Sequence, residues 1–343
     1  MAQTVVQSLR LGRGLLRTKL EVLEHLIENM KRLNILIWHI HGAYLTAITQ
    51  TQHNWFLPTK PGGPEGYIGR GRDSTMPDYV REVPAEAVRD LDLDLIICQT
   101  PQNYQTDRLE ILSPDQQQLP TIYLEHNTPE PQPTNSLHPV ADNPEVTLIH
   151  VTHYNRLMWN NGQTPTRVIE HSVAIDPTIR YNGYRQEGII VVNELQRRGR
   201  MAGLDLFEQL RQQVPLTVAG MKSAEIGGIG EIHYRHLHER VAEYRFLFSP
   251  MRYSSLPLAV IEAMTIGMPI VAVATTELPT VIQNGVHGFV SANPDELAQR
   301  MQFLIDHPTE ARQLGANARE LALSRFGINR FVADWNAVFA DVI

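Results

Sequence analysis

This sequence lacks most of the features that would assign it to a specialised class of protein. Its 343 residues include one cysteine, Cys98, which excludes an internal disulfide and fits a reducing, cytosolic compartment. No run reaches the roughly 18 apolar residues of a membrane span, and basic residues interrupt the apolar stretch that a signal peptide would need near the start. The formal charge of −7 argues against a nucleic-acid partner, which requires a basic surface.

The composition that remains is typical of a globular α/β protein. Hydrophobic residues make up 43% and charged residues 20%, and the length favours two domains. Short apolar runs alternate with helical patterns, which predicts two doubly wound parallel sheets with helices on both faces. Strands are expected within 34–42, 94–100, 121–129, 146–152, 189–193, 216–220, 245–250 and 269–274, helices over 43–56 and 83–91, and long loops over 58–78 and 127–145.

Residues 1–33 stand apart from this alternation. Leu16, Leu20, Leu23 and Ile27 form a helical stripe, so we expect an N-terminal helical extension. One interpretation is a basic amphipathic helix that contacts anionic lipid, which would make the protein peripheral at the inner face of the membrane. The other is a surface helix packed on the body, or extra sequence before a start at Met30. Acidic residues among the basic ones favour the second interpretation.

Basic side chains follow the first strand after the polar boundary at 164–177. Arg197, Arg198 and Arg200 lie beside Gly199, just after the predicted strand 189–193. Ligands of parallel sheets bind beyond the carboxyl ends of the strands, and arginine matches phosphate oxygens. We therefore expect a phosphate-binding loop here, followed by a helix from about Met201.

An acid stands in an apolar helix after the strand 245–250. Ser254, Ser255 and Leu256 lead through Pro257 into this helix, where serine hydroxyls would cap the free N–H groups, and Glu262 is its only acid. A carboxylate at this depth would accept hydrogen bonds from a ribose diol. The alternative is that Glu262 pairs with a nearby arginine and only orders the core.

Histidines appear at several places with different expectations. His126 comes shortly after the apolar run 121–124, where a group of the first domain would face the cleft, and the alternative is a histidine whose hydrogen bonds are satisfied by the backbone. His39 and His41 show no third ligand for a metal. The histidines of the stretch 232–244 (His233, His236 and His238) are expected on the surface of an amphipathic helix.

These residues carry a family likeness. The stretch 248–290, with its "EAMTIGMPIV" core, resembles the donor-site signature of the retaining glycosyltransferases of family four, which have the GT-B fold. The stretches 121–127 and 167–176 are similar to that family's cleft-histidine strand and its linker. The resemblance implies an acceptor-side domain over 34–168, a nucleotide-sugar donor domain over 178–325, and a C-terminal helix, 326–343, that packs back toward the first domain.

The resemblance also assigns roles. Glu262 would bind the nucleotide ribose, His126 would lie near the transferred sugar, and Gly42 would let the donor phosphate approach. Arg197, Arg198 and Arg200 stand where the family holds the diphosphate, without the usual spacing. The partners implied are a nucleotide-diphosphate-sugar donor and a glycan or lipid-linked acceptor, with no cofactor and no metal.

One departure keeps a second hypothesis open. Ser254 stands eight residues before Glu262, where the family has an acid that contacts the transferred sugar. Serine is neutral and shorter, so it cannot stabilise positive charge at the sugar carbon. The main expectation is a retaining glycosyl transfer in polysaccharide biosynthesis. The alternatives are a catalytically silent sugar-nucleotide-binding partner protein and another GT-B enzyme such as a sugar epimerase.

Overall fold

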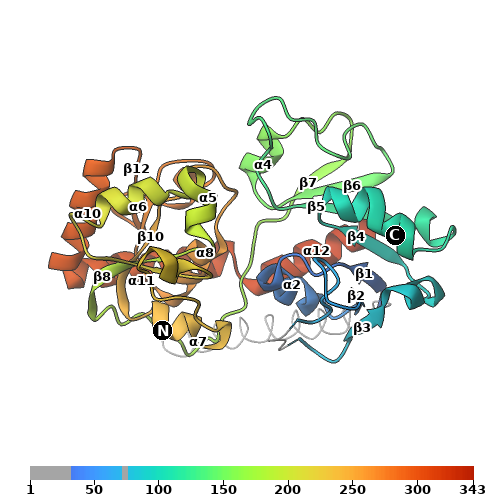
Figure 1. Ribbon diagram of the computed structural model, residues 1–343, viewed down its shortest axis with the longest axis horizontal. Coiled ribbons are helices and arrows are strands. Elements are labelled where there is room, and N and C mark those ends of the chain that lie inside the picture. The colour runs from blue at the N-terminus through green and yellow to red at the C-terminus, as the bar shows by residue number, and fades with distance from the viewer. Residues whose placement is uncertain (1–31, 72–75) are drawn as a thin grey trace, which may run out of the picture.

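The computed structural model describes residues 32–71 and 76–343, which form two lobes side by side (Figure 1). The helix expected over 1–33 therefore lies outside the described residues, apart from its last two positions. Each lobe is built on one parallel sheet, as the alternation of strands and helices predicts.

The first domain contains a seven-stranded sheet in the order β3-β2-β1-β4-β5-β6-β7, with every neighbouring pair parallel. Its central strands are buried on both faces, as parallel sheets require, whereas the two edge strands are partly exposed. They are β1 (Asn34–Ile37), β2 (Asn54–Thr59), β3 (Val80–Pro84), β4 (Leu95–Cys98), β5 (Thr121–Glu125), β6 (Val146–His150) and β7 (Thr166–Val168). The α-helices among them are α2 (Gly42–Ile48), α3 (Arg108–Ile111) and α4 (His153–Met158).

Two elements of this domain differ from the expectation. The helix predicted over 43–56 ends at Ile48 and continues only as a 3-10 turn, Thr49–Thr51, because Gln52 adopts a left-handed conformation with φ 61°. Trp55 and Leu57 are then fully buried in strand β2. The helix expected over 83–91 is a 3-10 helix, Ala85–Asp90.

The second domain contains a five-stranded parallel sheet in the order β12-β11-β10-β8-β9. Its strands are β8 (Arg185–Val191), β9 (Leu216–Ala219), β10 (Tyr244–Ser249), β11 (Ile270–Val273) and β12 (Gly288–Ser291). Its helices are α5 (Leu195–Ala202), α6 (Leu204–Leu210), α7 (Tyr234–Val241), α8 (Leu258–Ile266), α9 (Leu278–Val281), α10 (Pro294–Asp306) and α11 (Pro308–Arg325).

The last helix, α12 (Ile328–Val342), returns to the first domain and lies beside α2 (Figure 1). Its buried side chains Phe331, Trp335 and Phe339 belong to the same apolar cluster as strands β1, β2 and β4. The Trp335 indole donates a 3.1 Å hydrogen bond to the Tyr44 hydroxyl of α2. The end of the chain thus completes the core of its first half.

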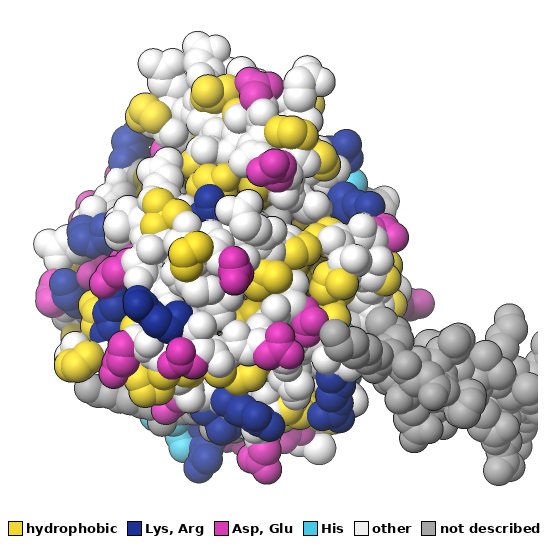
Figure 2. All heavy atoms as spheres, turned by 90° about the vertical axis from the view of Figure 1, so that its right-hand side faces the viewer, with side chains coloured by type: hydrophobic (Ala, Val, Ile, Leu, Met, Phe, Trp, Pro, Cys, Tyr) yellow, Lys and Arg dark blue, Asp and Glu magenta, His cyan; other side chains and the backbone are white. Residues whose placement is uncertain are grey.

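The outer face of the first domain shows no field of one charge sign. Figure 2 shows this face, on which basic and acidic side chains are interspersed with apolar ones. Such mixing agrees with the net negative charge of the whole chain.

Candidate functional site

A pocket of about 640 Å³ opens at the carboxyl ends of two strands of the second domain. Asn193 follows β8, Gly220 follows β9, and Tyr234 begins α7 on the opposite wall. The Asn193 amide oxygen accepts a 2.9 Å hydrogen bond from the Met221 N–H, which ties the two strand ends together. The same strand-end rule that selected the arginines would also have found Asn193 and Gly220.

Glu262 lies in the second turn of α8 and is only 7% exposed. Its Oε1 atom accepts a long hydrogen bond, 3.4 Å, from the Tyr234 hydroxyl and lies 3.5 Å from His238 Nε2. The partners of Glu262 are therefore side chains of α7, and the nearby arginine of the alternative hypothesis is not among the contacts in the described residues. The expectation that His238 is a surface residue is wrong, because α7 turns this side chain onto α8 and leaves it 6% exposed.

The three arginines belong to helix α5, whereas the sequence predicted a loop before the helix. Gly199 interrupts that helix with φ 53° and ψ −131°, so the helix is kinked between Arg198 and Arg200. Arg197 pairs with Glu194 and Arg200 pairs with Asp205, both at 2.6 Å. Within residues 32–71 and 76–343, the Arg198 side chain has no hydrogen-bond or ion-pair partner, and only its backbone N–H donates, to the Glu194 carbonyl. Burial and the neighbouring Arg197 lower the pKa of Arg198, so an anion would relieve an uncompensated charge.

The loop before α8 does not cap the helix as predicted. Pro257 is the residue at the N-cap, and no side chain bonds to the free N–H groups there. The Ser255 hydroxyl instead accepts a 3.2 Å hydrogen bond from the Asn155 amide of the first domain. Leu256 is buried in the core at 3% exposure, which leaves only its backbone for a ligand. Ser254 is partly exposed.

His126 follows β5 and lies between the rings of His41 and Tyr44, whose centroids are 4.1 and 4.7 Å away. Its Nε2 atom is 2.9 Å from the Gln99 amide oxygen, and the amide nitrogen of Gln99 donates to the Trp38 carbonyl. Nε2 therefore carries the proton and Nδ1 is the acceptor. Burial and the neighbouring His41 and His171 hold the pKa of His126 well below its usual range, so the ring is neutral.

Gly42 is the first residue of α2 and follows the stretch that contains His39 and His41. A Cβ at this position would lie 3.2 Å from the His39 ring, so a larger residue would require that ring to shift by a few tenths of an ångström. The residues assigned to the two sides of the site are linked by Asn155. Its amide nitrogen lies 3.4 Å from the His126 carbonyl and 3.2 Å from the Ser255 hydroxyl.

The loop after β11 holds two residues that the sequence did not point to. Thr276 adopts a left-handed conformation with φ 52°, which is strained for a β-branched residue. Glu277 is 2% exposed, and its Oε2 atom accepts a 2.7 Å hydrogen bond from the Tyr154 N–H at the start of α4. Its Oε1 atom accepts a second hydrogen bond, 2.8 Å, from the Thr280 hydroxyl. This loop therefore joins the two domains.

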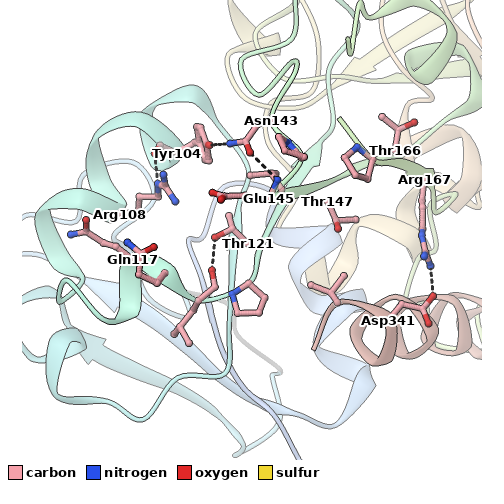
Figure 3. Close-up of a pocket in the computed structure, with 17 residues that line it drawn as sticks. Tyr104, Arg108, Gln117, Thr121, Asn143, Glu145, Thr147, Thr166, Arg167 and Asp341 are labelled. Carbon is pink, nitrogen blue, oxygen red and sulfur yellow. Dashed lines mark hydrogen bonds and ion pairs between the residues drawn. The ribbon is translucent and has the colours of Figure 1, made fainter. Parts of the chain in front are cut away.

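A larger pocket, about 800 Å³, lies at the other end of the first sheet (Figure 3). Thr121, Thr147 and Thr166 mark the beginnings of β5, β6 and β7 in its wall, and Arg167 pairs with Asp341 of α12 at one side. Because it lies at the amino ends of the strands, this pocket is not where the strand-end rule places a substrate.

Two kinds of feature are absent from the described residues. No group of three or more histidine, cysteine, aspartate or glutamate side chains in residues 32–71 and 76–343 is arranged to hold a metal ion. None of the helices in this part of the chain has both the length and the apolar character to cross a membrane.

Part of the second domain matches a known protein family. Residues 204–321 match the model of the family described as Glycosyl transferases group 1. This stretch of the second domain is therefore similar to that family. It includes Tyr234, Glu262 and the loop of Ser254 to Leu256, so the family resemblance seen in these residues is confirmed.

Two curated relatives match this chain over a limited stretch. The MMP alpha-(1->4)-mannosyltransferase of Mycolicibacterium hassiacum is 35% identical over 99 residues, which cover 27% of this chain and 24% of the relative. An uncharacterized glycosyltransferase of Haemophilus influenzae is 29% identical over 92 residues, covering 26% of each. The matches thus span about a quarter of each relative.

Solved structures cover nearly the whole chain and confirm the GT-B fold. Sucrose-phosphate synthase from Thermosynechococcus elongatus has a TM-score of 0.65 at 15% identity, covering 90% of this chain and 99% of that one. Anabaena HepE in complex with UDP-glucose has a TM-score of 0.66 at 12% identity, covering 90% and 100%.

Proposed function

We propose that this chain is a glycosyltransferase that moves a sugar, with retention of anomeric configuration, from a nucleotide-diphosphate-sugar to a glycan or lipid-linked acceptor. One observation carries the proposal. The pocket beside Tyr234, the Glu262 carboxylate and the Arg198 side chain all follow strand ends of the second domain, in which residues 204–321 match the glycosyl transferases group 1 family. These groups suit a base, a ribose and a diphosphate respectively.

The chemistry of the site follows from its charges. The Arg198 guanidinium would stabilise the negative charge that develops on the departing diphosphate, so the proposal requires no metal or other cofactor. The neutral His126 can accept a hydrogen bond from a sugar hydroxyl through Nδ1. It cannot act as a cation at neutral pH, because its pKa is lowered. The links of Asn155 and Glu277 between the domains would hold acceptor and donor in register.

The first test is nucleotide binding, measured by calorimetry or thermal shift with UDP, GDP, ADP and their sugars. UDP is the first probe, because the similar HepE was crystallised with UDP-glucose and TarM with UDP. Selective binding of one nucleotide supports the donor site, and binding of none contradicts it. The anomeric coupling constant of the product, measured by NMR, then tests retention, since an inverted product contradicts that part of the proposal.

A second candidate is the catalytically silent sugar-nucleotide-binding partner. Ser254 favours it, because a hydroxyl stands where the resemblance places an acid. The two candidates differ in turnover of the bound donor with an acceptor mixture. Activity that appears only in Ser254→Glu favours the silent partner, whereas turnover by the parent chain excludes it. A sugar epimerase, in contrast, would convert the donor with no acceptor present.

A further inference from the structure

Helix α7 contacts both the pocket that we propose for the nucleobase and Glu262, the carboxylate that we propose for the ribose. Tyr234, its first residue, lines the pocket and is 39% exposed there. At its far end the same side chain donates its hydroxyl to Glu262 Oε1 at 3.4 Å. One ring therefore contributes a face to the pocket and a hydrogen bond to the carboxylate beside it.

His238 approaches the same oxygen from one helical turn further along. Its Nε2 atom lies 3.5 Å from Glu262 Oε1, and its ring meets the Tyr234 ring edge-on at a centroid distance of 5.1 Å. The i and i+4 spacing places both side chains on one face of α7. Within residues 32–71 and 76–343 no other hydrogen bond or ion pair to the Glu262 side chain is formed, so Oε2 remains open.

The hydroxyl of Tyr234 stays a donor under all ordinary conditions. Burial and the negative charge of Glu262 raise the pKa of this phenol above its usual value. The phenol O–H donates to one carboxylate oxygen, and His238 Nε2, which forms no hydrogen bond of its own, lies 3.5 Å from the same oxygen. The two side chains thus restrict the rotation of the carboxylate and direct its second oxygen elsewhere.

We infer that Tyr234 is a stacking platform for the nucleobase, and that Tyr234 and His238 are positioning residues that aim Glu262 Oε2 at the ribose diol. This inference rests on the proposed donor site and names the residues that tune it. It predicts that the α7 side chains act on binding in two separable ways. The Tyr234 ring serves the base, whereas the Tyr234 hydroxyl and the His238 imidazole act on the ribose through Glu262.

The experiment compares two ligands by calorimetry. They are the nucleoside diphosphate that binds the parent chain most tightly and its 2′,3′-dideoxy analogue, which lacks the ribose diol. Tyr234→Phe keeps the ring and loses the hydroxyl, so we expect about 3- to 10-fold weaker binding of the complete nucleotide and unchanged binding of the analogue. His238→Leu should behave likewise, and His238→Gln, which restores an N–H, should recover most of the affinity.

Tyr234→Leu removes the stacking face and should weaken both ligands by about tenfold or more. Tyr184→Phe is the matched control, because Tyr184 is an exposed tyrosine of the same domain outside the pocket. Equal losses for both ligands in Tyr234→Phe, as a general packing defect would give, overturn the inference, and so does unaltered binding. A parent chain that binds no nucleoside diphosphate overturns the proposed function itself, and this inference with it.

Discussion

The backbone N–H of Tyr154 and the carboxylate of Glu277 form a 2.7 Å hydrogen bond across the boundary between the two domains. Glu277 is held for this contact by the Thr280 hydroxyl and by Arg325, whose Nη2 atom is 3.7 Å away. Arg325 in turn pairs at 2.6 Å with Glu170 of the segment that connects the domains. A single buried carboxylate therefore links the loop after β11 to the acceptor side.

Glu277→Ala should weaken the contact that holds the two domains together. A hydrogen bond to a charged group contributes about 1.5–3 kcal/mol, so its loss shifts the closure equilibrium by roughly 10- to 100-fold. We expect a larger radius of gyration in small-angle X-ray scattering and slower sugar transfer, with unchanged nucleotide affinity. Thr280→Val is the control, because it removes the neighbouring hydrogen bond and spares the one between the domains. A lower melting temperature with an unaltered radius and rate would show that Glu277 is only structural.

Glu262→Ala should abolish most donor binding without unfolding the chain. The carboxylate is the ribose ligand of the proposed site, and its removal should raise the nucleotide dissociation constant by about 10- to 100-fold. Glu239→Ala on the exposed face of α7 is the matched control, since that side chain is 68% exposed. Calorimetry with the preferred nucleotide provides the measurement, and equal affinity of both variants would refute the assignment.

Gly315→Ala should destabilise the protein although alanine is the better helix former. An added Cβ in α11 would lie 2.0 Å from the Gly267 carbonyl at the end of α8, a distance that forces the helices apart. The expected cost is about 1–3 kcal/mol, opposite in sign to the gain of about 1 kcal/mol at an open helix position. The exposed neighbour Ala316, changed to glycine, calibrates that intrinsic term in urea unfolding. Increased stability of Gly315→Ala would mean that α8 and α11 do not pack this closely.

Acidification should destabilise the fold between about pH 6.5 and pH 5. Burial and the neighbouring His41 and Arg330 lower the pKa of His171 to about 3, and burial and His138 lower that of His150 to about 3. The unfolded chain binds a proton at each ring near pH 6.5 and the folded chain does not. The free energy of unfolding therefore decreases as the pH is lowered, by about 1.4 kcal/mol per pH unit for each ring.

Urea unfolding at several pH values measures this slope. His171→Gln removes one titrating ring, so the slope of the variant should be smaller than that of the parent over the same range. An exposed histidine, changed as His236→Gln, should leave it unaltered, because that side chain is 67% exposed. A parent stability that is flat from pH 7 to pH 5 would show that these rings are protonated in the folded protein.

The sequence predicted the fold and part of the candidate site, for reasons that particular residues make clear. Glu262 stands out because an acid inside an apolar helix is unusual, and the strand-end rule places its helix at the substrate edge. Strand β2 was missed, since Trp55 and Leu57 follow a helical pattern without a break other than Gln52, whose left-handed backbone no composition signal marks.

Residues that act through tertiary contacts were beyond the reach of local patterns. Helix α7 is so polar that His238 was assigned to the surface, and only its packing on α8 buries the ring. Glu277 and Tyr154 are 123 positions apart, so the sequence around one of them gives no sign of its contact with the other. Local pattern analysis thus finds elements and strand ends, and it misses pairs that meet only when domains assemble.

The return of α12 to the first domain also constrains how the chain is made. Phe331, Trp335 and Phe339 fill the core beside β1 and β2, about 300 residues after those strands are synthesised. Domains that emerge from the ribosome fold in order, so this apolar face of the first sheet stays exposed during translation until α12 has been synthesised. Exposed apolar surface promotes aggregation. The nascent first domain is therefore a natural client for chaperones until the final helix leaves the ribosome, and removal of that helix would extend this exposure to the finished protein.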